Sequence, residues 1–354
     1  MSRVVHIVGT GTIGEPLIGL FTDFASKMGI DEVTFHKRTP LRSDRAKLEH
    51  LMARGAKLAV DADRVEEFEE LGHKVSYLAG EALARATVVT DCTPAGNLHK
   101  EETYAELDGP TGFLAQGSEF GFGKPYARGV NDEVLSPEED RFIQIVSCNT
   151  HNITTLVKTL CAEEDGGFSL AHADFVCIRR ANDISQTESF IPSPNVGRHD
   201  DPEFGTHHAR DAYHLFKTQG LDLDLFSSAL KVNTQYMHSI WFHLQMNRDI
   251  TREEVVERLI GNPRVAVTEK RDANLIFSFG RDHGYYGRIL SQTVVVLPTV
   301  MVRRNRDVYG FCFTPQDGNS LVSSVAAALW RMDPDWEEVG QRLSPIRRWV
   351  YREI

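Results

Sequence analysis

The amino-terminal segment VVHIVGTGTIGEPL constrains the fold of this chain more than any other feature. Gly9, Gly11 and Gly14 follow a short β-branched run and precede a segment with helical periodicity. In a strand–turn–helix unit, glycines at this spacing permit a tight turn, close backbone approach to a pyrophosphate, and close packing of the helix on the strand. The N–H groups at the helix start also attract phosphate. The segment predicts a dinucleotide-binding unit; the alternative is a glycine-rich turn without a ligand.

Strand-like and helix-like segments alternate through the first half of the chain. The strand-like segments are RVVHIVG, EVTFHKR, KVSYLAG, TVVTDCTP, TGFLAQGSE and RFIQIVS. This alternation predicts parallel βαβ units, so we expect an α/β fold with a Rossmann doubly wound parallel sheet. The second half has longer strand-like runs with less helix between them. It predicts a separate α+β catalytic domain with a mixed or antiparallel sheet.

A chain of 354 residues is long enough for two domains of ordinary size. We expect a dinucleotide-binding domain over residues 1–147, completed by a carboxyl-terminal helical segment over 318–354, and a catalytic domain over 148–317. Residues 191–211 are rich in Pro, Gly and His, and we expect a long ordered loop there. The apolar run LVSSVAAALWRM predicts a helix that packs back on the first domain.

Charge and composition argue against several classes of partner. A formal net charge of −11 disfavours nucleic acid, and no apolar run approaches the roughly 20 residues needed to cross a membrane. The first residues enter a strand without the features of a signal peptide. The five cysteines are scattered and odd in number, which indicates a reduced, cytoplasmic protein whose cysteine chemistry is catalytic. No metal is expected, because the histidines near residues 199–208 lack ligand spacing with an acid or thiol.

The second strand-like segment bears on the choice of dinucleotide. It ends in His36, Lys37 and Arg38, where an NAD-binding domain usually has an acid for the ribose 2′-hydroxyl. Cationic groups at this point favour a 2′-phosphate, so we expect NADP in preference to NAD. The alternative is a solvated basic turn. Thr93 and Pro94 end a later buried strand and are expected beside the nicotinamide half of the cofactor, because the carboxyl ends of parallel strands line the ligand crevice.

The segment SCNTHNITT places Cys148 between a strand-like run and a helix-like run. A cysteine at a helix start has its thiolate stabilised by the helix dipole, so we expect a lowered pKa and a nucleophile that attacks a carbonyl. The alternative is a buried structural thiol beside a turn. The polar neighbours Ser147, Asn149, Thr150 and His151 are unusual for such a thiol.

Several of these motifs, in their order, resemble those of the archaeal-type (class II) glyceraldehyde-3-phosphate dehydrogenases. The amino-terminal GTGTIG, the strand end DCTP and SCNT carry the resemblance first. QGSE is also similar to that family's QGGE, VCIRRANDI to VxVRRGADP, THHARD to HHGPD, YMHSIW to LMHQH, and GNPRVAV to NTPRV. These matches extend from the first strand to about residue 316.

The resemblance implies roles for individual residues. Cys148 would be the nucleophile and His238 the catalytic base, with Asn149 stabilising the developing oxyanion. The implied cofactor contacts, besides the glycine turn, are Thr12, Ile13, Ser118, Arg180 and Gln316. The implied substrate contacts are Ser147, Cys148, Asn149, Thr150, His151, His208 and Ala209. Without the resemblance, His238 would more often be a packed core histidine, on a helix with Trp241 and Phe242.

Basic residues near the second half of the chain also indicate an anion site. Arg179 and Arg180 end a strand-like run, and the loop that follows carries His207, His208 and Arg210. We expect them to form an anion pocket for a phosphorylated aldehyde and inorganic phosphate. The alternative is a solvated strand end.

The implied activity is the reversible, NAD(P)-dependent phosphorylating oxidation of glyceraldehyde 3-phosphate by a homotetramer. The chain departs from the family at CNTHN, where the family has CNTTG, and at Ser118, Phe120 and Ala209. Another semialdehyde or acylating aldehyde dehydrogenase is therefore the nearest alternative, and His151 could be a phosphate ligand or a second base. A non-catalytic dinucleotide-sensing protein is the alternative from a different class.

Overall fold

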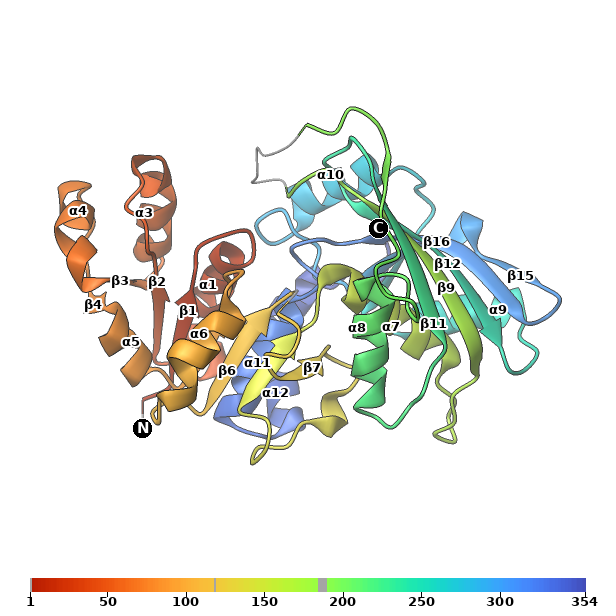
Figure 1. Ribbon diagram of the computed structural model, residues 1–354, viewed down its shortest axis with the longest axis horizontal. Coiled ribbons are helices and arrows are strands. Elements are labelled where there is room, and N and C mark those ends of the chain that lie inside the picture. Colours follow the sequence, from red (N-terminus) through yellow and green to blue (C-terminus); the bar gives the residue numbers. More distant parts are fainter. Residues whose placement is uncertain (1, 118, 184–189) are drawn as a thin grey trace. The chain divides into compact units, whose positions relative to one another are not determined.

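The computed structural model describes residues 2–117, 119–183 and 190–354 (Figure 1). The chain forms two compact units, which are described separately. Unit 1 comprises Met1–Lys124, Leu135–Ile145 and Leu321–Arg347, and unit 2 comprises Pro125–Val134, Val146–Ser320 and Arg348–Ile354. Among the described residues, no helix has the length and apolarity needed to cross a membrane.

Unit 2 contains four segments that we expected in the first domain: 125–134 and 348–354, and the boundary residues 146–147 and 318–320. In residues 125–134, the Asn131 amide donates to Thr218 Oγ1 at 3.1 Å, and the carbonyl of Arg128 accepts from Gln292. At the carboxyl terminus, the Ile354 N–H donates to the carbonyl of Val267. These contacts join residues that are far apart in the sequence, so the local pattern did not reveal them.

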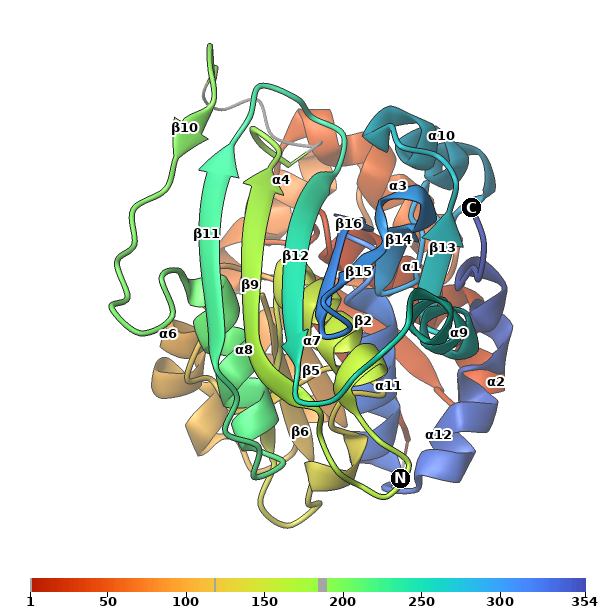
Figure 2. The ribbon, with the colours of Figure 1, turned by 90° about the vertical axis from the view of Figure 1, so that its right-hand side faces the viewer.

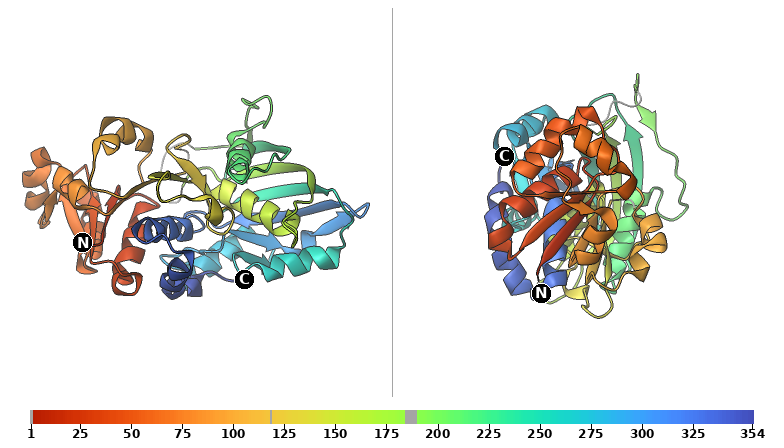
Figure 3. Two further views of the ribbon diagram at one scale, coloured as in Figure 1. Left: turned by 90° about the horizontal axis from the view of Figure 1, so that it is seen from below. Right: turned by 90° about the vertical axis from the view of Figure 1, so that its left-hand side faces the viewer.

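Unit 1 is built on a parallel sheet that confirms the predicted Rossmann-type fold. Its strands are β1 (Val4–Val8), β2 (Glu32–His36), β3 (Lys57–Val60), β4 (Tyr77–Leu78), β5 (Val88–Asp91), β6 (Gly112–Gln116) and β8 (Phe142–Ile145). The edge strand β7 (Lys124–Tyr126) shares only Lys124 with this unit. Their order is β4-β3-β2-β1-β5-β6-β8-β7, with parallel pairing from β4 through β8. All five residues of β1 are buried, as expected of a central strand covered on both faces. The right-hand view of Figure 3 faces β1 to β4 and the red and orange helices beside them.

Helices cover the sheet of unit 1. They are α1 (Gly14–Asp23), α2 (Ala25–Met28), α3 (Arg45–Ala53), α4 (Val65–Glu70), α5 (Ala79–Arg85), α6 (Gly96–Glu102), α11 (Leu321–Met332) and α12 (Trp336–Arg342). The apolar run near the carboxyl terminus forms α11, which packs on β5 and β6 and buries Leu321, Val325 and Leu329. α11 is therefore part of unit 1.

Unit 2 contains a mixed sheet, also as predicted. Its strands are β9 (Leu170–Arg179), β10 (Asn195–Val196), β11 (Leu225–Lys231), β12 (His238–Met246), β13 (Val265–Thr268), β14 (Thr293–Val296), β15 (Met301–Arg303) and β16 (Asp307–Thr314). Their order is β10-β11-β9-β12-β16-β14-β13, and β15 pairs with β16. β12 runs antiparallel to both β9 and β16, whereas β9 and β11 are parallel.

One face of this sheet is covered by helices. The helices of unit 2 are α7 (Cys148–Cys161), α8 (His207–Lys217), α9 (Arg252–Gly261) and α10 (Ala273–His283). Figure 2 shows the strands in front of α7 and α8. Ile153 and Leu156 of α7 and Phe216 of α8 join Phe242 of β12 in the main core. This core fixes the position of α7, whose first residue is Cys148.

Two predictions about secondary structure in this unit were wrong. His238 does not lie on a helix but begins β12, where burial alternates residue by residue. Trp241 and Phe242 consequently lie on opposite faces of the sheet, since side chains alternate along a strand. The segment 191–211 is not wholly a loop, because it contains β10 and the first turn of α8.

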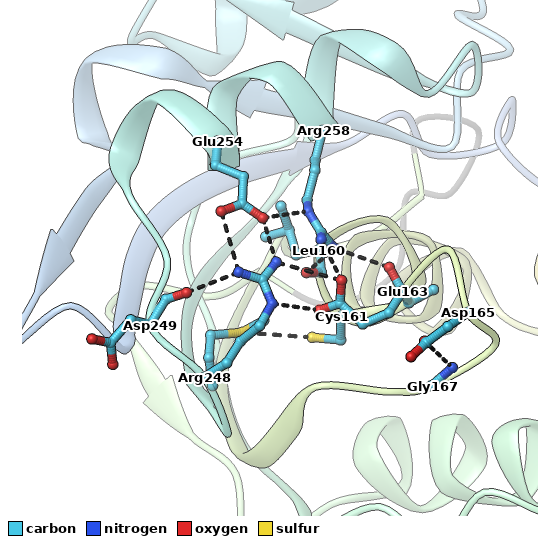
Figure 4. Close-up of polar contacts among 11 residues, drawn as sticks. Leu160, Cys161, Glu163, Asp165, Gly167, Arg248, Asp249, Glu254 and Arg258 are labelled. Carbon is cyan, nitrogen blue, oxygen red and sulfur yellow. Dashed lines mark hydrogen bonds and ion pairs between the residues drawn. The ribbon is translucent and has the colours of Figure 1, made fainter.

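A cluster of charged side chains fixes the carboxyl-terminal end of α7 (Figure 4). Glu163 pairs with Arg248 at 2.7 Å and with Arg258 at 2.6 Å, and Glu254 also contacts both arginines. Arg258 donates as well to the carbonyls of Leu160 and Ala162 at the end of the helix. These contacts satisfy carbonyls that have no partner within the helix and join α7 to α9.

Candidate active site

Cys148 is the first residue of α7, and the local sequence explains why the helix begins there. Ser147 is the N-cap: its backbone is extended, and its Oγ accepts the Thr150 N–H at 3.4 Å and contacts Thr150 Oγ1 at 2.8 Å. Serine is among the preferred residues for this position. The Cys148 carbonyl accepts from Asn319 Nδ2 at 2.8 Å, and the same nitrogen donates to the carbonyl of Gln292 at 3.1 Å. Asn319 thus ties the backbone of Cys148 to that of Gln292.

The predicted lowering of the Cys148 pKa was wrong. The residue is partly exposed, but its thiol is enclosed by protein, and this burial raises the pKa to about 11. The Asp317 carboxylate raises it further, and Arg180 opposes the change. Burial disfavours the charged thiolate more than the helix start favours it. Cys148 is therefore a thiol at neutral pH in the structure.

Thr314 connects the start of α7 to the strand that carries His238. Its hydroxyl donates to Asn149 Oδ1 at 3.1 Å and accepts from Asn152 Nδ2 at 2.9 Å. Thr314 is also the residue directly opposite His238 in the ladder between β12 and β16. A short, fully buried bridge therefore links the neighbour of Cys148 to His238.

The ring of His238 is held by two other predicted site residues. Its Nδ1 accepts the backbone N–H of Arg180 at 2.9 Å. The side-chain amide of Gln316 contacts His238 twice: Oε1 accepts the His238 N–H at 3.1 Å, and Nε2 lies 2.6 Å from the ring Nε2. His238 is buried, and burial together with the charge of Arg180 lowers its pKa well below the ordinary value. The imidazole is therefore neutral at pH 7.

The charge of Arg180 acts on both Cys148 and His238. Two acids hold its guanidinium group in place. Its guanidinium contacts Asp183 at 2.8 Å and Asp317 at 3.1 Å. Asp317 adopts a left-handed backbone conformation, with φ of 59°. Arg180, Gln316 and Asp317 also line a cavity of about 230 Å³ that extends to Phe277 on α10 and to Tyr286.

A second group of predicted residues gathers at the start of α8. Arg179, His207 and Arg210 line a cavity of about 360 Å³ together with Arg198. His208, the next residue of the helix, is almost fully buried, and within the described part of the chain neither of its ring nitrogens has a hydrogen-bond partner. Burial and the neighbouring His207 hold its pKa well below the ordinary value. The Ala209 N–H donates to Ser227 Oγ at 3.0 Å.

His151 lies in the first turn of α7 and is enclosed by protein. Its side chain is fully buried, and its Nδ1 lies 3.1 Å from the Ser147 carbonyl. Burial lowers its pKa to about 4, although hydrogen bonds to the backbone act in the opposite direction. Thr150 is also fully buried and takes part in the cap described above. Both residues shape the start of α7.

The glycine turn of unit 1 is tightly packed at Gly14 and open at Gly11. Gly9 has φ of 94°, and a Cβ on Gly14 would lie 2.1 Å from the Gly9 carbonyl oxygen. A Cβ on Gly11 would meet nothing within 4 Å, so the backbone of this residue faces open space. Thr12 and Ile13 complete the turn, and Ile13 caps α1 without a side-chain hydrogen bond. No side chain of the cap therefore competes with an anion for the first N–H groups of α1.

The basic residues after β2 contact acids. Lys37 pairs with Asp44 at 2.6 Å, and His36 contacts Asp61 at 3.1 Å. Burial lowers the pKa of His36, so it is neutral at pH 7. These ion pairs reduce the positive charge expected at this turn, which leaves Arg38 as its most prominent cation.

The end of β5 meets the glycine turn in unit 1. The Thr93 methyl lies 3.1 Å from the position of a Cβ on Gly9. Thr93 donates its N–H and its hydroxyl to Asp91, which also accepts from Tyr104 and contacts His99. Pro94 directly follows Thr93. Ser118 lies outside the described residues.

Three residues of this region were not predicted. Thr314, Asp317 and Asn319 contact Asn149, Arg180 and Cys148 respectively. They come from the segment TPQDGNS, which surrounds the predicted Gln316. The cluster of turn-forming residues directly after a strand was the available signal. Among the described residues, no group of three or more His, Cys, Asp or Glu side chains is placed to hold a metal ion.

A parallel sheet with an open glycine turn, and a second unit with a cysteine at a helix start, are the features expected of cysteine-dependent, dinucleotide-linked dehydrogenases. No model of a protein family matches the chain. The glyceraldehyde-3-phosphate dehydrogenase of Methanobacterium formicicum is 30% identical over 283 residues, which cover 76% of this chain and 75% of that protein. That of Pyrobaculum calidifontis is 26% identical over 355 residues, or 95% and 94% of the two chains. The chain therefore belongs to the archaeal-type glyceraldehyde-3-phosphate dehydrogenase family, as the resemblance implied.

Proposed function

We propose that the chain catalyses the NAD(P)-dependent phosphorylating oxidation of an aldehyde, most specifically the reversible conversion of glyceraldehyde 3-phosphate to 1,3-bisphosphoglycerate. The observation that carries the proposal is the placement of Cys148 at the start of α7, bridged through Asn149 and Thr314 to the strand of His238. The names of the relatives support the substrate.

The chemistry begins at the Cys148 sulfur. The sulfur bonds to the aldehyde carbon, the thiol proton passes to the aldehyde oxygen, and a hemithioacetal forms. His238 accepts the hydroxyl proton as a hydride leaves the same carbon, and the product is a thioester on Cys148. Inorganic phosphate then attacks the thioester, the carbon–sulfur bond breaks, and an acyl phosphate leaves. N–H groups at the start of α7 and the Asn149 side chain are the candidate donors to the developing oxyanion.

The residues of unit 1 fit a nicotinamide dinucleotide, which accepts the hydride when bound. Gly9, Gly11 and Gly14 leave room for a pyrophosphate at the uncapped start of α1. Thr12, Ile13, Thr93 and Pro94 complete the proposed contacts in this unit, and Arg180 and Gln316 are proposed as further contacts in unit 2. Lys37 and Arg38 favour NADP over NAD, although the Asp44 pairing weakens the contribution of Lys37.

The basic cavity at the start of α8 is the proposed site for the substrate's phosphate. Arg179 and His207 line it, and Arg210 adds a further cation. His208 and Ala209 of the same helix are proposed to contact the substrate, together with Ser147. The enzyme is proposed to be a cytoplasmic homotetramer, and light scattering in solution will measure its mass.

Steady-state kinetics test this function directly. We expect reduction of NADP, and more slowly of NAD, with glyceraldehyde 3-phosphate, and we expect the rate to require inorganic phosphate. Cys148→Ser should lose at least about a thousandfold in kcat, because a serine hydroxyl is a far poorer nucleophile than a cysteine sulfur at neutral pH. Cys161→Ser, at the other end of α7, is the matched control and should remain active. Turnover by Cys148→Ser at the parental rate would overturn the proposal.

The departure at His151 and Asn152 favours one second candidate. Their side chains are both fully buried in α7, where the family has a small Thr-Gly pair. Because these larger side chains change the shape of the helix start, an acyl acceptor other than phosphate could bind there. Cysteine-dependent turnover that is independent of phosphate but requires a thiol acceptor would identify an acylating dehydrogenase instead.

A further inference from the structure

The side chain of Lys47, on α3, contacts the glycine turn of unit 1. Its Nζ donates to the carbonyl of Thr10, in the middle of that turn, at 3.2 Å. The same Nζ lies 3.3 Å from Asp44 Oδ1, and Asp44 Oδ2 accepts from Lys37 Nζ at 2.6 Å. Lys37 directly follows the end of β2. The Lys47 ammonium and the Asp44 carboxylate therefore connect the glycine turn to the basic turn after β2.

This connection spans the two places where a dinucleotide contacts a doubly wound sheet. In such a sheet the pyrophosphate lies at the glycine turn, and the ribose 2′ position lies at the end of the second strand. We infer that Lys47 is a ligand of the 2′-phosphate of NADP, together with Lys37, and that Asp44 holds the two ammonium groups together and limits their attraction for that phosphate. The inference rests on the proposed function, because it assumes that unit 1 binds the dinucleotide.

The hydrogen bonds of Lys47 leave it able to bind an anion. An ammonium group has three N–H donors. Within the described residues, the Thr10 carbonyl and Asp44 take up two of these donors, so one remains for a phosphate oxygen. The Lys47 side chain is 27% exposed, so a ligand can reach it. Because its ammonium group is already held in place, Lys47 loses less side-chain entropy on binding than a freely moving lysine would.

Asp44 is ionised at neutral pH and weakens the positive charge of the two lysines. Desolvation alone would raise the pKa of Asp44, but hydrogen bonds and charges from Lys37 and Lys47 outweigh this effect and lower the pKa. The two lysines and Asp44 together carry one net positive charge, from two positive charges and one negative charge. A phosphate monoester carries nearly two negative charges at pH 7. Removal of the Asp44 charge should therefore strengthen the attraction for a 2′-phosphate.

The experiment is a fluorescence titration with NADPH and with NADH, in the absence of aldehyde and inorganic phosphate. We expect Lys47→Met to raise the Kd for NADPH about tenfold and to change the Kd for NADH less than about twofold, because only NADPH carries the 2′-phosphate. We expect Asp44→Asn to lower the Kd for NADPH about threefold or more, with NADH again within about twofold. Lys57→Met is the matched control, because Lys57 begins β3 at the opposite edge of the sheet and pairs with Glu32.

Three results would overturn the inference. Equal losses of NADPH and NADH affinity in Lys47→Met, at a parental Tm, would show that the lysine supports the glycine turn or the pyrophosphate instead. Parental NADPH affinity in Lys47→Met, or unchanged or weaker NADPH affinity in Asp44→Asn, would also overturn it. Asp44→Asn keeps the inference testable if Lys47→Met unfolds. Because no aldehyde is present, a selective loss of NADPH affinity would stand even if Cys148→Ser showed that the proposed reaction is wrong, whereas a parent that binds neither dinucleotide would refute both.

Discussion

At the scale of single residues, the chemistry of Cys148 is governed by its surroundings. Burial and the Asp317 carboxylate raise the pKa of its thiol to about 11, and Arg180 only partly compensates. Asp317 itself is buried, and this burial raises its own pKa above the usual range despite the pairing with Arg180. Burial first, and then the two opposite charges of Asp317 and Arg180, therefore set how much thiolate is present.

Removing the Asp317 charge should activate the thiol. We expect Asp317→Asn to lower the pKa of Cys148, because a carboxylate no longer opposes the thiolate and Arg180 loses a competing partner. Asparagine tolerates the left-handed backbone at this position, so the fold should persist. The measurement is the rate of iodoacetamide alkylation between pH 6 and 11, where the parent should gain about tenfold per pH unit. Asp63→Asn, exposed in unit 1, should behave as the parent; an unchanged or higher pKa in Asp317→Asn would contradict the electrostatic account.

At the scale of elements, α7 is fixed at both ends by different devices. Ser147 caps its start and presents Cys148, whereas Arg258 satisfies carbonyls at its end. Desolvation alone would raise the pKa of Glu163, but hydrogen bonds from Arg248, Ser169 and Arg258 outweigh it and lower the pKa to about 2. The cluster in Figure 4 therefore depends on an ionised Glu163.

The stability that Glu163 supplies should depend on pH with a definite sign. Its folded pKa lies below its unfolded value, so its contribution is fully present above about pH 4.5 and is lost as the pH falls towards 2. We expect Glu163→Gln to lower Tm by a few degrees at pH 7, with a smaller difference at pH 3. Glu164→Gln, the adjacent exposed residue, is the control. A Tm difference that grows on acidification would refute the assignment, and calorimetry at the two pH values measures it.

At the scale of the whole molecule, the two units carry different features of the candidate site. Unit 1 supplies a parallel sheet with a glycine turn at the carboxyl end of β1, and unit 2 supplies the cysteine, the histidine and the basic cavity. Under the proposed function, unit 1 holds most of the dinucleotide contacts, and unit 2 holds the reacting groups. Substitutions in the turn should then affect binding without touching the thiol.

Two glycines of the turn should respond differently to the same substitution. Gly11→Ala adds a methyl group into open space, so Tm should stay within about 2 °C of the parent. The Kd for dinucleotide should rise about tenfold, because the methyl group would occupy the space proposed for the pyrophosphate. Gly14→Ala would place a carbon 2.1 Å from the Gly9 oxygen and should lower Tm strongly. Thermal unfolding and fluorescence titration with NADPH measure both effects. Parental dinucleotide affinity in Gly11→Ala would argue against this turn as the phosphate site.

The amino-acid sequence by itself determined the features that depend on local order. Alternating strands and helices, the turn of Gly9 and Gly14, and a cap before Cys148 follow from neighbouring residues, and the family motifs are contiguous. Tertiary structure alone decided the sign of the Cys148 pKa shift, because burial and Asp317 act through space. It likewise decided that His238 begins a strand and meets Gln316 and Arg180, since three distant segments supply those atoms. Short-range geometry can be read along a chain, whereas desolvation and charge pairing depend on which segments the fold brings together.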